Sequence, residues 1–61
     1  MNIDDLLKMN ENDAIKLIKD FSLTYRIVGR DGVNFVHTAE FRGDRVDLAI
    51  KDGIVVRATF S

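Results

Sequence analysis

The 61-residue chain contains no cysteine, no proline and no tryptophan, and it has a single histidine. Without cysteine it can form neither a disulfide nor a thiolate metal site. The histidine, His37, has no cluster of carboxylates near it in the sequence, whereas a metal site needs several ligands at suitable spacing. No apolar run approaches the roughly 20 residues that cross a bilayer. We therefore expect no metal, no cofactor and no membrane span.

Charge is also nearly balanced, which bears on the class of partner. Nine basic residues face ten acidic ones, for a net charge of −1. Nucleic acids and anionic membranes both attract an excess of Lys and Arg, so neither is expected as the main partner. The chain is long enough for one domain, residues 1–61, which would bury about 60% of its unfolded surface. We expect a monomer, with a dimer paired through an exposed edge strand as the alternative.

The first five residues are acidic and lack the basic-then-apolar pattern of a secretion signal. The expectation is either a cytoplasmic protein or the mature form of a secreted one.

The pattern of apolar residues predicts one helix and three strands. Asn10 is a suitable N-cap before an acidic first turn, and the helix should end near Asp20. Its apolar face recurs at helical spacing and comprises Ala14, Leu17, Ile18 and Phe21. Alternation predicts strands at residues 24–28, 45–50 and 54–60, the last two joined by a hairpin turn at Asp52-Gly53. The predicted core comprises Leu17, Ile18, Val46, Leu48, Ile50 and Val56.

A long connection, roughly residues 29–43, separates the first two predicted strands. A loop of about a dozen residues is unusual in so small a domain and tends to be functional or disordered. This one carries four apolar residues, Val33, Phe35, Val36 and Phe41. They indicate either a binding surface or part of the core.

No set of residues predicts an enzyme. Ser22 and Ser61 have no base and orienting group to form a triad. The acidic residues are better explained as solvated surface charges, and the glycines form no phosphate-binding pattern. The tripeptide Arg42-Gly43-Asp44 spells a cell-adhesion motif, but three residues occur together by chance in many proteins.

Residues 38–48, Thr-Ala-Glu-Phe-Arg-Gly-Asp-Arg-Val-Asp-Leu, resemble the reactive-site region of the potato inhibitor I family. That pattern has Thr, a variable residue, an acid, an aromatic or Leu, Arg, any residue, Asp or Asn, and then Arg-Val-Arg-Val or Leu. The similarity extends over roughly residues 6–60, with Asn10 in the place of a serine N-cap.

The resemblance implies an α+β fold in which one helix packs on a small mixed three-stranded sheet, with a long protease-binding loop between the first two strands. It implies a serine protease inhibitor of subtilisin-like, elastase-like or chymotrypsin-like enzymes, acting through a substrate-like loop. The reactive bond would be Ala39–Glu40, and the methyl of Ala39 suits a small, shallow specificity pocket. The resemblance assigns further loop residues as protease contacts (Val36, His37, Thr38 and Phe41) and as braces beneath the loop (Arg42 and Arg45).

The chain departs from the family pattern at Asp47, where a second bracing arginine is expected. A carboxylate there should repel the acidic side of the loop, so Asp47→Arg is predicted to strengthen inhibition. The family's N-terminal tryptophan is also missing. The alternative is a non-inhibitory protein-binding module of the same fold that uses Val33, Phe35 and Val36.

Overall fold

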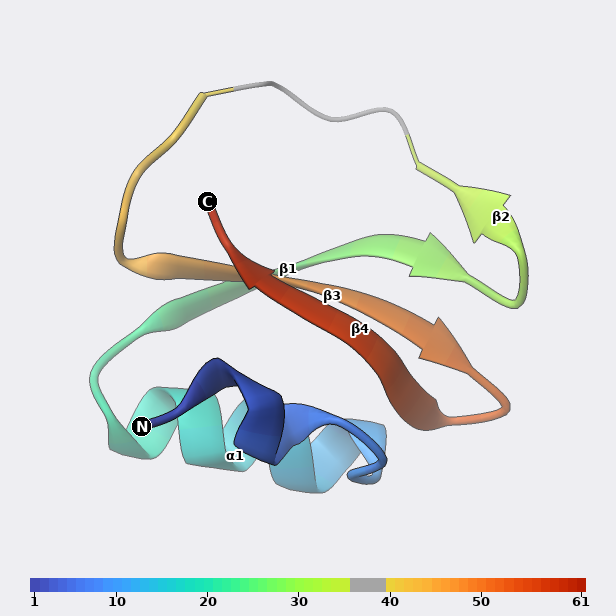
Figure 1. Ribbon diagram of the computed structural model, residues 1–61, viewed down its shortest axis with the longest axis horizontal. Helices are drawn as coiled ribbons and strands as arrows, with labels where there is room; N and C mark the ends of the chain where they lie inside the picture. Colours follow the sequence, from blue (N-terminus) through green and yellow to red (C-terminus); the bar gives the residue numbers. More distant parts are fainter. Residues whose placement is uncertain (36–39) are drawn as a thin grey trace.

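The structure of the protein is a computed structural model, which describes residues 1–35 and 40–61. It has one α-helix and a four-stranded mixed open sheet (Figure 1). In chain order the elements are η1 (Ile3–Leu6), α1 (Glu11–Asp20), β1 (Thr24–Arg30), β2 (Val33–Asn34), β3 (Arg45–Lys51) and β4 (Ile54–Phe60).

The predicted helix is confirmed, and so is its N-cap. The Asn10 side chain accepts a hydrogen bond from the backbone N–H of Asn12 at 2.8 Å, and α1 ends at Asp20. Ala14 and Ile18 are fully buried. Phe21, predicted to share that face, is half exposed because it forms the C-cap, where the chain has already left the helix. In the part of the chain that is described, no helix is long and apolar enough to cross a membrane.

The sheet has the strand order β2-β1-β3-β4. β1 and β3 run parallel, and the other two pairings are antiparallel. The prediction of three strands is therefore wrong, because the sheet has a fourth strand, β2. The predicted loop between the first two strands is corrected as well, since β1 and β2 are joined directly by a short turn. Residues 35–44 connect β2 to β3.

The extra strand arises from the turn at Asp31-Gly32, which was predicted only as part of the long connection. Both residues have positive φ, 52° and 84°, as do Asp52 and Gly53 at 53° and 77°. Consecutive positive φ angles are what a two-residue hairpin turn requires. The same Asp-Gly signal therefore forms two hairpins, of which one was predicted.

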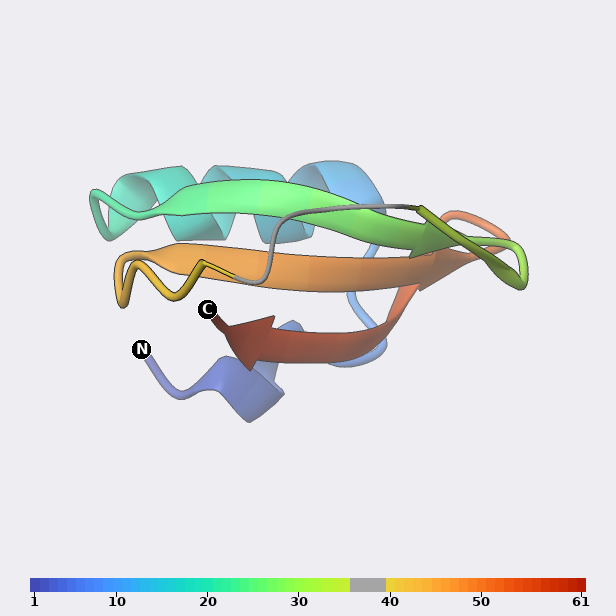
Figure 2. The ribbon, with the colours of Figure 1, turned by 90° about the horizontal axis from the view of Figure 1, so that it is seen from above.

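The core lies between one face of the sheet and the helical elements α1 and η1. Figure 2 shows the strands from above, with α1 behind β1 and η1 next to β4. Its buried side chains are Leu6, Ala14, Ile18, Val46, Leu48, Ile50 and Val55. Val56, predicted to be buried, is 54% exposed. The pairing of β3 with β4 shifts register between Ala49 and Ile50, so β4 has one extra residue there and Val55 faces inward instead.

Candidate functional site

The candidate site lies on the face of the sheet away from α1, where β1 and β3 begin. Along β3, Val46 and Leu48 enter the core, so the alternate residues Arg45 and Asp47 face the other way. The last part of the β2–β3 connection, residues 40–44, lies over this end of the sheet (Figure 1). We call residues 40–44 the exit segment.

An ion pair between β1 and β3 forms the centre of the site. Arg26 and Asp47 are direct partners in the parallel register, so their side chains leave the same face one strand apart. The Arg26 guanidinium donates two hydrogen bonds to the Asp47 carboxylate, from Nε at 3.0 Å and from Nη2 at 2.8 Å. The two side chains are only 20% and 9% exposed. A bidentate pair of this kind fixes orientation as well as charge.

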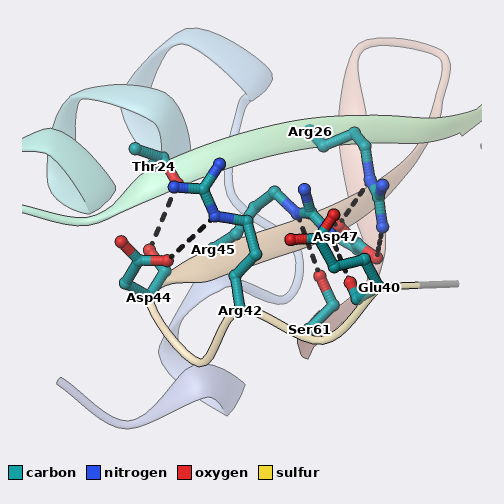
Figure 3. A network of polar contacts seen from close by, with 8 residues as sticks. All are labelled: Thr24, Arg26, Glu40, Arg42, Asp44, Arg45, Asp47 and Ser61. Carbon is teal, nitrogen blue, oxygen red and sulfur yellow. Dashed lines mark hydrogen bonds and ion pairs between the residues drawn. The ribbon is translucent and has the colours of Figure 1, made fainter. Parts of the chain in front are cut away.

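Arg45 joins this pair to the exit segment (Figure 3). Its Nη2 donates to the backbone carbonyl of Glu40 at 2.8 Å, and its Nε donates to the Ser61 hydroxyl at 3.2 Å. The same Nε lies 3.7 Å from Asp47 Oδ1. One guanidinium therefore contacts the connection, the end of the chain and the buried carboxylate.

The electrostatics of the site centre on Asp47. Burial raises the pKa of this carboxyl, but hydrogen bonds from Arg26 and Ser61 and the charges of Arg26 and Arg45 outweigh burial. The net effect holds the pKa of Asp47 below its ordinary value. The hydrogen bond to Asp47 is the main reason that the pKa of Arg26 is raised, and the charge of Glu40 contributes to the same rise.

Further hydrogen bonds hold the C-terminal end of the exit segment, at Gly43 and Asp44. The Asp44 carbonyl accepts from the Thr24 backbone N–H at 2.9 Å and from the Thr24 hydroxyl at 3.3 Å. The Gly43 N–H donates to the Ser61 carbonyl at 2.8 Å, and the Ser61 N–H donates to the Arg45 carbonyl at 2.9 Å. The exit segment is therefore held from β1 on one side and from Ser61 on the other.

The predicted site residues fall into two groups. Four of them, Val36, His37, Thr38 and Ala39, lie outside the described residues. Among the others, Glu40 accepts from Arg45, and Phe41 is the most exposed large apolar side chain described, at 73%.

Arg42 does not reach beneath the connection in the way that Arg45 does. Its Nε lies 3.6 Å from the Asp44 carboxylate, and both side chains are more than half exposed. An exposed pair of this kind contributes little to stability.

The expected effect of Asp47 also needs correction. The sequence suggested a carboxylate that repels the acidic side of the connection, but two arginines neutralise it. Arg26 and Ser61 were missed as site residues. The alternation that predicts the strand at residues 24–28 marks Arg26 only as a polar position, and the sequence marks Ser61 only as a serine without a triad. Parallel pairing of the predicted strands at residues 24–28 and 45–50 places Arg26 near Asp47.

A second feature is a shallow cavity of about 350 Å³ at the opposite end of the same sheet. Its lining combines apolar and basic side chains, among them Arg30, Val33, Ala49, Lys51, Val56 and Arg57. Val33 and Val56 are 60% and 54% exposed. This cavity shares no residue with the cluster around Asp47.

Within residues 1–35 and 40–61, no group of three or more His, Cys, Asp or Glu side chains is arranged to hold a metal ion. Every buried side-chain nitrogen or oxygen in these two ranges has a hydrogen-bond partner. Comparisons with models of protein families, with curated proteins and with solved structures gave no match to this chain.

Proposed function

We propose that this protein is a serine protease inhibitor that presents the β2–β3 connection as a substrate-like loop, with Ala39–Glu40 as the reactive bond. The observation that carries the proposal is the hydrogen bond from Arg45 to the Glu40 carbonyl. Glu40 follows the proposed reactive bond directly. An arginine that is itself 12% exposed therefore holds the backbone beside that bond.

The mechanism requires a loop that is held before the protease arrives. A held loop loses little conformational freedom on binding, and this favours tight association. If the bond is cut, contacts on the exit segment keep the new end at Glu40 in place, so religation competes with hydrolysis. Tight binding of the uncut loop stabilises the ground state and does not accelerate turnover.

The target class follows from the residue before the proposed bond. Ala39 offers one methyl group, which suits the shallow pockets of subtilisin-like and elastase-like enzymes. Against the deep apolar pocket of a chymotrypsin-like enzyme it forgoes the burial of a larger side chain, about 1.5–3 kcal/mol. Ala39→Leu is therefore expected to improve inhibition of chymotrypsin and to weaken inhibition of elastase.

The test measures inhibition of subtilisin and pancreatic elastase, followed by mass spectrometry of the recovered chain. The proposal predicts tight inhibition with slow, partial cleavage between Ala39 and Glu40. Arg45→Gln should weaken inhibition and speed that cleavage, because the Glu40 carbonyl loses its donor. Arg57→Gln is the matched control, since Arg57 lines the cavity at the other end of the sheet. Rapid cleavage without inhibition, or neither event, would refute the proposal.

The second candidate function is a non-inhibitory protein-binding module. It is favoured by the cavity at the β2 end of the sheet, where the exposed Val33 and Val56 adjoin Lys51 and Arg57. Exposed apolar side chains beside basic ones suit a partner surface that is both apolar and acidic. In this case Val33→Ser removes binding, whereas Ala39→Leu changes nothing.

A further inference from the structure

The shallow cavity at the β2 end of the sheet is formed by two small residues on the central strands (Figure 1). Gly29 on β1 pairs with Ala49 on β3, and the same row continues to Asn34 on β2 and to Arg57 on β4. Paired residues lie on the same face of a sheet, so a hydrogen and a methyl group lie between two longer side chains. A Cβ added at Gly29 would lie 3.3 Å from Asn34 Oδ1 and 3.8 Å from the Ala49 Cβ. Glycine therefore keeps the floor of the cavity open.

The bulge in β4 gives the cavity an apolar wall beside a basic one. The pairing of β3 with β4 skips Val56, which is the extra residue of the bulge. Consecutive residues of a regular strand face opposite sides of the sheet, but Val56 and Arg57 both line the cavity. Val33 lines it from β2, and both valines are more than half exposed. An apolar group and a cation are thus side by side at one opening.

The lining of the cavity is positively charged, although the whole chain has a net charge of −1. Among the described residues that line it, three are basic and none is acidic. Arg30 is neutralised by Glu11 through two hydrogen bonds of 2.7 and 2.9 Å. The side chains of Lys51 and Arg57 form no ion pair within the described part of the chain. Two cations at the cavity therefore lack an anion.

We propose that this cavity binds a small apolar carboxylate, with its carboxylate group between Lys51 and Arg57 and its hydrocarbon chain against Val33 and Val56. A volume of about 350 Å³ is within the range of cavities that hold small organic ligands. A guanidinium binds a carboxylate through two parallel hydrogen bonds, which fixes the orientation of the ligand. The inference goes beyond the proposed function and does not depend on it, because the cavity contains no residue of the cluster around Asp47.

The experiment is a titration followed by NMR, with the amides of Gly29 and Ala49 reporting on the floor of the cavity. The probe is hexanoate, and its control is hexanamide, which has the same chain without the charge. We expect hexanoate to bind saturably with a Kd of about 1 mM, the order that small ligands reach in an open site. Hexanamide should bind at least about fivefold more weakly, the order of one exposed ion pair.

Two variants test the charge and the shape of the cavity separately. Arg57→Gln should weaken hexanoate binding about fivefold and leave hexanamide binding unchanged, a cycle that isolates the interaction between the carboxylate and Arg57. Ala49→Leu should abolish binding of both probes, because the larger side chain fills the floor. Arg42→Gln is the matched control, since it removes another exposed arginine at the other end of the sheet. It should change neither Kd.

The simpler explanation is that Lys51 and Arg57 are solvated cations, balanced by Asp31 and Asp52 in the adjoining turns. In the described part of the chain neither of these acidic residues lines the cavity. On this explanation the two probes bind equally or not at all, and either result overturns the inference. Unchanged hexanoate binding in Arg57→Gln overturns it as well. Should Ala49→Leu fail to fold, the cycle of two probes and Arg57→Gln decides alone.

A glutamate side chain of a partner protein carries the same chemical group as the small acid. A blocked tripeptide with glutamate between two valines, titrated in the same way, separates the two sources. Weaker binding of the peptide than of hexanoate supports the inference. Tighter binding of the peptide overturns it and assigns the cavity to the protein-binding module. A parent protein that binds hexanoate as expected but inhibits no protease would refute the proposed function and leave this site standing.

Discussion

Asp47→Asn should destabilise the protein, and the loss should depend on pH. The Asp47 side chain is 9% exposed and accepts two hydrogen bonds from Arg26. Asparagine has nearly the same shape but carries no charge, so two arginines would share a site without an anion between them. Removing one partner of a buried ion pair costs about 3–5 kcal/mol. Asparagine keeps one acceptor oxygen and water reaches part of Arg26, so we expect a loss of about 1–3 kcal/mol.

The pH dependence follows from the lowered pKa of Asp47. A carboxyl whose pKa is lower in the folded state than in the unfolded state stabilises the fold above the unfolded pKa, about 3.9 for Asp. That contribution is lost as the pH falls through the folded value. The asparagine side chain of the variant does not titrate. The stability difference between parent and variant should therefore be full at pH 7 and shrink below about pH 4.

The assay is urea unfolding of both proteins at intervals between pH 7 and pH 2.5. A 61-residue domain is stable by only a few kcal/mol, so a loss of this size moves the midpoint clearly. Glu11→Gln is the control: its carboxylate also pairs bidentately with an arginine, but that pair is far more exposed, and the loss should be smaller. Equal stability of parent and Asp47→Asn at pH 7 would refute the reasoning. So would a difference that persists unchanged at pH 2.5.

The remaining predictions concern the register, one turn and the charge of the site. Val55→Ala should cost about 2–3 kcal/mol by denaturant unfolding, whereas Val56→Ala should stay within about 0.5 kcal/mol, since only Val55 is buried. A larger loss of stability for Val56→Ala than for Val55→Ala would contradict the bulge in β4. Gly53→Ala should cost about 1–2 kcal/mol because φ is +77° there and nothing lies within 4 Å of an added Cβ, so no clash contributes; unchanged thermal stability would contradict it. Asp47→Arg should lower stability more than Asp47→Asn and weaken protease inhibition, because it places a third guanidinium beside Arg26 and Arg45. Stronger inhibition by this variant would restore the view that Asp47 repels the connection.

Local signals predicted most of the fold. The helix from its Asn10 cap to Asp20 and the Asp52-Gly53 hairpin each depend on residues close together in the sequence, and both are confirmed. The errors have local causes too. The Asp-Gly pair at residues 31–32 is the same turn signal as at 52–53, but β2 is only two residues long and leaves no alternation to detect. The Val56 error came from a bulge, which moves an alternating pattern by one residue without any mark in the sequence.

The site could be predicted only where one residue acts on a near neighbour. Arg45 and Glu40 are five residues apart, and the resemblance to an inhibitor loop identified both as site residues. Arg26 and Asp47 are 21 residues apart, and their contact depends on which strands are adjacent and in which register. Neither follows from the residues of one strand alone.

This dependence on register changes how the substitution at position 47 is judged. Considered along one strand, a carboxylate in place of an arginine removes a positive charge from beneath the connection and adds a negative one. Considered across the face of the sheet, Arg26 stands one strand away in the same register and returns the positive charge. The charge that acts on the connection is the sum of the charges on this face. Arg26 and Arg45 contribute two positive charges, and Asp47 and Glu40 contribute two negative ones. The charge at position 47 alone therefore does not give the charge of the face beneath residues 40–44.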